Sequence, residues 1–140
     1  MTKKIALVSA CLLGLKTRYD GKELTHKKVL ALQDEYLLIP VCPEQLGGLS
    51  TPRNPSEIRE EKVFDCEGKD VTSFFEKGAL SVLKIAQLIK PNLIIFKERS
   101  PSCGVKEIAD GTFSGRKIPG QGVSTRFLAK YFNVISEEDL

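Results

Sequence analysis

The apolar residues of this chain gather in short runs that are separated by polar segments. Residues 3–9, 36–42 and 92–97 are largely apolar with few polar interruptions, and a shorter run covers residues 132–135. Runs of this length without a regular polar alternation are typical of strands that are covered on both faces of a sheet. The pattern therefore predicts four buried strands.

A different spacing marks the segments that connect these runs. In residues 72–90 the apolar side chains recur on one face of a long helix, which a proline then ends. A short helix is predicted within residues 25–35, with Thr25 as its N-cap, and another near the C-terminus, capped by Ser124 or Thr125. The predicted buried face of the long helix consists of Phe74, Phe75, Leu80, Val82, Leu83, Ala86, Leu88 and Ile89.

Residues 43–70 lack a sustained periodicity. They contain three prolines and three glycines, so most of the segment is predicted to be loop, with one edge hairpin that turns at Glu67 and Gly68. Loops of this length inside a compact domain are usually functional or disordered, and the density of specific residues here favours function.

The order of the predicted elements indicates an α/β fold. Strands alternate with helices or long loops, which implies parallel strands joined by right-handed crossovers. We therefore expect a single three-layer Rossmann-like domain over residues 1–140, with a mostly parallel sheet of about four strands. Such domains bind their ligands beyond the carboxyl ends of the strands.

Three of the four cysteines follow predicted strands. Cys11 comes two residues after the first strand, Cys42 closes the second, and Cys103 lies six residues after the third. Three separate loops therefore bring thiols to one edge of the sheet, a position that Cys66 does not share. One cysteine alone is most often a small buried hydrophobe, but three at one edge favour a set of ligands.

Other residues of the sequence restrict which metal group these thiols are expected to bind. The chain has no Cys-x-x-Cys pair, and its one histidine, His26, lies at the solvent-facing start of a predicted helix. His26 is therefore not expected to be a fourth ligand or the base of a nucleophilic cysteine. An iron–sulfur cluster with three cysteine ligands fits better than a closed zinc site, because one iron then stays open to a substrate atom.

Composition and charge restrict the partners. The 140 residues carry 21 basic and 18 acidic side chains, a net charge of +3, and no basic run is longer than two residues. This balance does not indicate nucleic-acid binding. The apolar runs are too short to span a membrane, and the N-terminus does not read as a signal peptide. We expect a cytoplasmic protein with reduced thiols and a small-molecule partner.

Four motifs carry a resemblance to a known family. They are SACLLGLKTRYDG at residues 9–21, VCPEQLGGLSTPRNPSE at 41–57, FKERSPSCG at 96–104 and DGTFSGRKIPGQGVSTRFL at 110–128. In this order, over nearly the whole chain, they resemble the motifs of the small bacterial TudS-like thiouracil desulfidases. The resemblance implies a [4Fe-4S] cluster bound by Cys11, Cys42 and Cys103. It also implies non-redox removal of sulfur from a thiolated pyrimidine, such as the hydrolysis of 4-thiouracil to uracil and sulfide.

Glu44 is the predicted general acid or base of such a reaction. It lies two residues past Cys42, and the intervening proline limits where its side chain can point. We expect Glu44 to activate water for attack on the carbon while the open iron binds the substrate sulfur as a Lewis acid, without reductant or nucleotide. The resemblance favours Ser100 as the proton-handling partner of Glu44, whereas Ser102 binds substrate or satisfies the loop backbone.

Cations in the same loops are candidates for charge compensation. A cluster with three thiolates is negatively charged and needs nearby cations or hydrogen-bond donors. Arg18 and Arg53 are the predicted substrate-binding cations, and Arg53, in a stiff segment flanked by prolines, is the better anchor. Glu57 is either a partner for one of these arginines or an exposed loop carboxylate, and Lys97 and Arg99 are either further compensating cations or solvated loop charges.

Two other classes of protein compete with this interpretation. A non-catalytic carrier of a metal or an iron–sulfur cluster would use the thiols without needing Glu44 or Ser100. A nucleotide-binding Rossmann-like module would need a glycine-rich phosphate loop, but no GxGxxG motif follows the first predicted strand. The carrier therefore stays as the alternative to a desulfidase.

Overall fold

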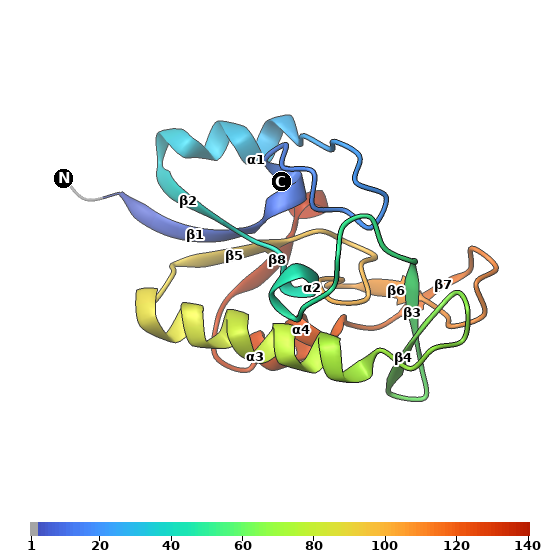
Figure 1. Ribbon diagram of the computed structural model, residues 1–140. Helices are drawn as coiled ribbons and strands as arrows, with labels where there is room; N and C mark the ends of the chain where they lie inside the picture. Colours follow the sequence, from blue (N-terminus) through green and yellow to red (C-terminus); the bar gives the residue numbers. More distant parts are fainter. Residues whose placement is uncertain (1–2) are drawn as a thin grey trace.

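The computed structural model describes residues 3–140, which form a four-stranded parallel sheet with helices on both faces (Figure 1). The strands of the sheet are, in spatial order, β2 (Tyr36–Val41), β1 (Lys4–Ser9), β5 (Leu93–Phe96) and β8 (Val134–Ser136). This confirms the predicted three-layer α/β fold. The last strand begins two residues later than the predicted run, which started at Phe132.

Different helices cover the two faces of the sheet. The helices are α1 (Lys27–Ala31), α2 (Pro43–Leu46), α3 (Thr72–Ile89) and α4 (Val123–Leu128), with single 3-10 turns at Ala10–Leu12, Leu32–Asp34 and Glu137–Asp139. Successive side chains of a strand point to opposite faces. Val8 of β1 therefore shares one buried cluster with Val29 of α1, whereas Leu7 shares the other with Val82 of α3 and Leu128 of α4. This explains why the runs in β1 and β5 carry no polar alternation.

The strand order opens a crevice at the carboxyl edge of the sheet. From β1 the chain goes to β2 on one side, and from β5 it goes to β8 on the other, so the winding reverses between β1 and β5. Loops diverge at such a reversal and leave room for a ligand. The segments that carry Cys11 and Cys103 leave these two strands, and both therefore border the crevice.

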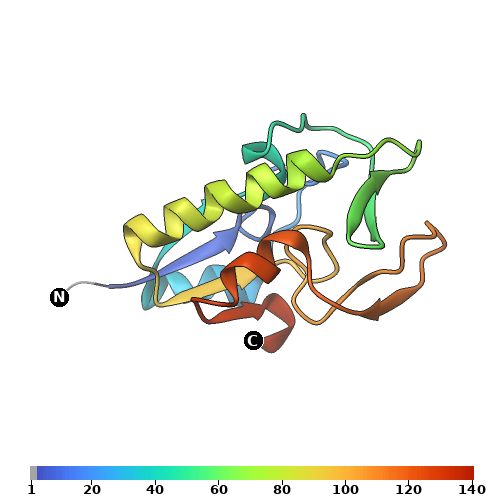
Figure 2. The ribbon, with the colours of Figure 1, turned by 90° about the horizontal axis from the view of Figure 1, so that it is seen from below.

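Two hairpins extend beyond the same edge of the sheet (Figure 2). One pairs β3 (Ser56–Arg59) with β4 (Lys62–Asp65), and the other pairs β6 (Glu107–Ala109) with β7 (Lys117–Pro119). The Glu57 carboxylate joins them, because its Oε1 accepts hydrogen bonds of 3.0 Å from the N–H groups of Gly111 and Phe113. The sequence did not predict the second hairpin, whose strands are only three residues long.

The turn of the first hairpin corrects the prediction. Its strands pair across Glu60 and Glu61, which adopt φ angles of 51° and 67°, and not across Glu67 and Gly68. A turn does occur at Glu67 and Gly68, but only a single bridge flanks it. Two successive glutamates at positive φ are unusual, so the sequence carries no signal for the true turn.

The predicted cap of the first helix is also wrong. His26 caps α1, and its Nδ1 accepts the N–H of Val29 at 3.3 Å. Thr25 is held one residue earlier in a bridge to Leu13, where its hydroxyl donates to Glu23. An extended residue in a bridge is not placed to cap the helix, so the cap falls to His26.

Gly122 begins α4 in place of the predicted Ser124 or Thr125. A Cβ atom on Gly122 would lie 2.4 Å from the carbonyl carbon of Ser102, so only glycine fits this approach. Both predicted caps are buried inside the helix, and the Thr125 hydroxyl donates to the carbonyl of Cys103 at 2.9 Å. The helix start is therefore set by its contact with the Cys103 loop.

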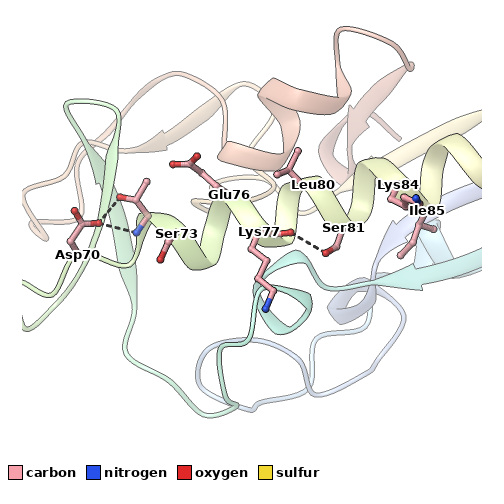
Figure 3. A pocket seen from close by; sticks show the side chains of 9 residues that line it. Asp70, Ser73, Glu76, Lys77, Leu80, Ser81, Lys84 and Ile85 are labelled. Carbon is pink, nitrogen blue, oxygen red and sulfur yellow. Dashed lines mark hydrogen bonds between the residues drawn. The ribbon is translucent and has the colours of Figure 1, made fainter.

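Of the eight residues of the predicted face, the long helix α3 buries three and partly buries three more, but it leaves Leu80 and Leu88 exposed, at 55% and 72%. Leu80 lies on an open groove of about 940 Å³ along the outer side of the helix, between Asp70 and Ile85 (Figure 3). The groove is lined from one helix and its N-terminal approach, without a thiol. None of the helices in residues 3–140 combines the length and apolar character that a membrane crossing requires.

Candidate functional site

A cavity of about 370 Å³ opens at the carboxyl edge of the sheet. Cys11, Cys42 and Cys103 all line it, from three different segments of the chain. Cys66 is exposed in the turn after β4 and does not contribute to the cavity. The structure therefore places around one cavity the three thiols that the sequence grouped together, and it separates the fourth.

Each thiol is positioned by a different local structure. Cys11 lies in the 3-10 turn that directly follows β1. Cys42 is the N-cap of α2, a short helix in a segment predicted to be loop. Pro43 is the first residue of this helix, a position that suits proline. Cys103 follows the turn after β5, where its N–H donates to the Ser100 hydroxyl at 3.0 Å.

Burial disfavours the ionised form of all three thiols. It raises the pKa of Cys11 to about 11, with a smaller contribution from the neighbouring Cys42. Burial also raises the pKa of Cys42 and the pKa of Cys103. A positively charged metal group in this cavity would displace the protons and stabilise the thiolates, as metal ligation by cysteine requires.

The spacing of the thiols bears on the kind of metal group. Within residues 3–140, no three His, Cys, Asp or Glu side chains converge closely enough to hold a single metal ion. An iron–sulfur cluster distributes its cysteine ligands over different irons, so its ligands do not need to meet at one point. Three thiols spread around one cavity suit such a group.

Glu44 is held by a largely buried arginine. Nε of Arg53 donates to Oε1 of Glu44 at 2.9 Å, and the two side chains are only 7% and 14% exposed. Arg53 also donates to the carbonyls of Thr17, at 2.9 Å, and Ser50, at 3.2 Å, and to the hydroxyl of Thr51, at 2.8 Å. The guanidinium therefore fixes the carboxylate and joins two loops that border the cavity.

The hydroxyl that contacts Glu44 is that of Ser102. It donates to Oε2 of Glu44 at 2.9 Å and lies 3.6 Å from the sulfur of Cys103. The Ser100 hydroxyl lies 3.0 Å from that of Ser102 and accepts the N–H groups of Ser102 and Cys103. The two serines thus exchange the predicted contacts, because Ser100 folds back to cap the loop backbone and leaves Ser102 to face the carboxylate.

The predicted substrate-binding cations differ in the contacts that they make within the protein. Arg53 lines the cavity and uses donors on all three of its nitrogens within the protein, one of them to position Glu44. Arg18 lines the cavity, with its guanidinium carbon 6.0 Å from the ring centre of Tyr19. Lys97 also lines the cavity and forms an ion pair of 3.2 Å with Glu137.

Glu57, Arg99 and His26 differ in how they relate to the cavity. Glu57 lines the cavity but holds the second hairpin, so the predicted pairing with an arginine is wrong. Arg99 is not simply solvated, because it forms ion pairs with Glu107 and Glu138. His26 lies outside the cavity lining, at the start of α1.

Sequence reasoning missed several residues of the cavity. Lys117 reaches it from β7, and Tyr19 is the single aromatic side chain among its described lining residues. Glu98 is 1% exposed and also lines the cavity. The only sequence signal for Glu98 was an acidic residue directly after a buried strand, between two cations.

Comparisons with known proteins bear on the family of the chain. Residues 6–139 match the family model described as 2-thiouracil desulfurase. The uncharacterized protein YbbK of Bacillus subtilis (strain 168) is 42% identical over 145 aligned positions, which cover 96% of each chain. A solved structure described as the [4Fe-4S]-dependent thiouracil desulfidase TudS superimposes with a TM-score of 0.89 at 38% identity, over 99% of this chain and 93% of that one.

Proposed function

Because the chain belongs to the 2-thiouracil desulfurase family, we propose that it hydrolyses the carbon–sulfur bond of a thiolated pyrimidine with a [4Fe-4S] cluster bound by Cys11, Cys42 and Cys103. The observation that carries the proposal is the arrangement of one cavity. Three thiols from three loops border it, and the hydrogen-bonded pair of Glu44 and Ser102 lines the same cavity.

The chemistry of the donor set supports the cluster. Three cysteines leave one iron of a four-iron cluster without a protein ligand. When bound, the cluster supplies this iron as a Lewis acid for the sulfur of the substrate. Lys97 and Arg18 line the same cavity and compensate the negative charge of the cluster and its thiolates.

Glu44 is the proposed general base. Its Oε1 is occupied by Arg53, which fixes the orientation of the carboxylate, and its Oε2 faces Ser102. A carboxylate held in this way accepts a proton from water as the water attacks the carbon that bears sulfur. The overall reaction converts a thiopyrimidine and water into the corresponding pyrimidine and hydrogen sulfide.

Ser102 is the proposed hydroxyl partner of this base. Its hydroxyl touches Glu44, Ser100 and the sulfur of Cys103, and it is almost fully buried. Such a position suits transfer of a proton between the carboxylate and the departing sulfur. Ser100 acts through Ser102, since it fixes the loop backbone on either side of that residue.

The cavity suits a small substrate. Its volume, about 370 Å³, lies at the lower end of the range for small-molecule sites, which is roughly 300–1,000 Å³. Arg18 is the cation most available for a polar group of the substrate. A free thiopyrimidine base, such as 4-thiouracil, is therefore the proposed substrate class.

The decisive experiment separates chemistry from metal binding. Wild type, Glu44→Gln and Cys66→Ser are reconstituted with iron and sulfide under anaerobic conditions and compared at equal iron content. Conversion of 4-thiouracil to uracil is followed by ultraviolet absorbance. We expect Cys66→Ser to match wild type, and Glu44→Gln to keep the cluster while kcat falls by roughly 10²–10⁴, as for loss of a general acid or base.

Two results would change the proposal in different ways. A wild type that binds the cluster but desulfurates no thiopyrimidine would favour the non-catalytic carrier. Full activity in Glu44→Gln would exclude Glu44 as the base and direct attention to Ser102.

A further inference from the structure

Glu98 is a buried carboxylate that the proposed reaction does not use. It lies two residues past the end of β5, at the beginning of the loop that carries Ser102 and Cys103. Its side chain is 1% exposed, although a carboxylate is rarely buried without a cation as its direct partner. No ion pair of Glu98 with a basic side chain occurs within residues 3–140.

One oxygen of this carboxylate gathers four backbone N–H groups. Oε1 accepts hydrogen bonds from Arg99, at 3.3 Å, and from Val105, Lys106 and Glu107, at 2.8, 2.9 and 3.2 Å. The first donor lies where the loop begins and the other three where it ends. A single anionic oxygen therefore closes the loop that contains Ser102 and Cys103.

The main chain of Glu98 is fixed as well. Its N–H donates to Oε1 of Glu137 at 2.7 Å, and its carbonyl accepts the ammonium of Lys97 at 2.9 Å. Glu137 is itself buried and forms an ion pair with Lys97. The backbone of Glu98 is thus held by the C-terminal 3-10 turn, and its carboxylate in turn holds the loop in place.

The second carboxylate oxygen of Glu98 lowers the stability of the folded protein. Oε2 is buried and has no hydrogen-bond partner among residues 3–140. An unpaired buried carboxylate oxygen destabilises the folded state, and a glutamine at this position would leave its amide N–H groups unpaired at the same place. The folded protein therefore keeps this charge at a cost in stability.

From these contacts we infer that Glu98 is a positioning residue of the active site, which holds Cys103 on the cluster and Ser102 on Glu44. The inference rests on the proposed function for the roles of these two partners. The negative charge is needed because four N–H dipoles converge on one oxygen, and a neutral carbonyl oxygen binds them more weakly. Glu98 borders the cavity, and in this assignment it acts on the reaction through Ser102 and Cys103.

The first test uses the protein without its cluster. Amide hydrogen exchange is measured residue by residue in wild type, Glu98→Gln and Glu107→Gln. Glu107→Gln removes a half-exposed carboxylate from the same loop and leaves its backbone bonds intact, so it serves as the matched control. We expect exchange at Val105 and Lys106 to accelerate about tenfold or more in Glu98→Gln alone, while the amides of β1 stay protected.

The second test uses the reconstituted enzyme. In Glu98→Gln, iron is expected to be lost to a chelator about ten to a hundred times faster than in wild type, as for other residues that orient metal ligands. The kcat for 4-thiouracil falls by a similar factor at equal iron content, while KM changes less than about twofold because the substrate contacts remain. Glu98→Ala enlarges these effects, and Glu107→Gln shows none of them.

Three results would overturn the inference. One is exchange at Val105 and Lys106 that does not change in Glu98→Gln. Another is an equal acceleration of exchange in β1, which would indicate a general loss of stability. The third is an unchanged kcat together with unchanged iron retention. If wild type desulfurates no thiopyrimidine, the proposed function fails, but amide exchange and iron retention still decide the role of Glu98.

Discussion

The two loops that face each other across the cavity are organised by buried charges of opposite sign. In residues 42–53, Arg53 donates to two carbonyls, a hydroxyl and the carboxylate of Glu44. In residues 98–107, the carboxylate of Glu98 accepts four backbone N–H groups and forms no ion pair within residues 3–140. Each loop carries a cysteine and one member of the Glu44–Ser102 pair.

The two loops are organised by opposite charges because different backbone groups need hydrogen-bond partners in each. Neither loop has a large apolar core of its own, so its backbone groups need polar partners inside the protein. In the first loop, Arg53 meets two carbonyl oxygens, that of Ser50 in the same loop and that of Thr17 in the segment after β1, which its several N–H groups can satisfy together. The second loop presents N–H groups, which one carboxylate oxygen can collect. The first charge is neutralised by its partner Glu44, and the second is stabilised by dipoles alone.

The largest expected effect comes from removing the cation of the first loop. In Arg53→Met the carboxylate of Glu44 loses its partner in a site where both side chains are largely buried. Breaking a buried pair in this way costs roughly 3 kcal/mol or more of stability. Urea-induced unfolding of the protein without its cluster measures the change, with Arg116→Met, at an exposed position, as the control.

Arg53→Lys sharpens this result. Lysine keeps the charge but cannot reproduce the forked donors that reach Thr17, Ser50 and Glu44 together. We expect it to recover only part of the lost stability. Equal stability of Arg53→Lys and wild type would show that charge alone organises the first loop, and the contrast with Glu98 would then lose its geometric basis.

We expect an effect of intermediate size on the rates at which the thiols of the two loops are alkylated. Cys42 is partly exposed, whereas Cys103 is buried, so iodoacetamide should alkylate Cys42 at least about tenfold faster in the protein without its cluster. The thiolate is the nucleophile, and burial raises the pKa of Cys42. The rate at Cys42 should therefore keep rising at more alkaline pH than for an ordinary thiol.

Mass spectrometry of peptides after timed alkylation gives both rates, and the exposed Cys66 provides the internal standard. Reaction of Cys103 as fast as Cys42 would mean that the second loop opens in solution, contrary to the closed arrangement around Glu98.

The smallest effect is expected at the outer surface of the second loop. Arg99 forms ion pairs with Glu107 and Glu138, but all three side chains are between 35% and 43% exposed. Such pairs contribute about 0–1 kcal/mol. Arg99→Met should therefore lower the free energy of unfolding by less than about 1 kcal/mol in urea. A loss as large as that of Arg53→Met would show that ion pairs, and not Glu98, hold this loop.

The elements that follow hydrophobic spacing were predictable from the sequence. The runs that became β1, β2 and β5, and the long helix α3 ended by Pro91, lie close to where the pattern placed them. In contrast, the hairpin turn at Glu60 and Glu61, the cap at His26 and the start of α4 at Gly122 are set by neighbouring segments. Local sequence cannot report contacts with residues far along the chain.

In the candidate site, too, some features were predictable from the sequence and others were not. Parallel topology sufficed to place Cys11, Cys42 and Cys103 at one edge of the sheet, because the carboxyl ends of parallel strands share an edge. The choice between Ser100 and Ser102 depended on one turn of the loop, and the partner of Glu57 depended on a hairpin that the sequence did not reveal.

The sequence by itself therefore determined the α/β architecture, the grouping of three cysteines and the separation of Cys66, because strand periodicity and chain order are local properties. The tertiary structure decided which polar groups meet. It paired Glu44 with Arg53 and Ser102, and it closed the Cys103 loop on Glu98. Hydrogen bonds of about 3 Å depend on the packing of several loops at once, and residue spacing along one chain does not encode that geometry.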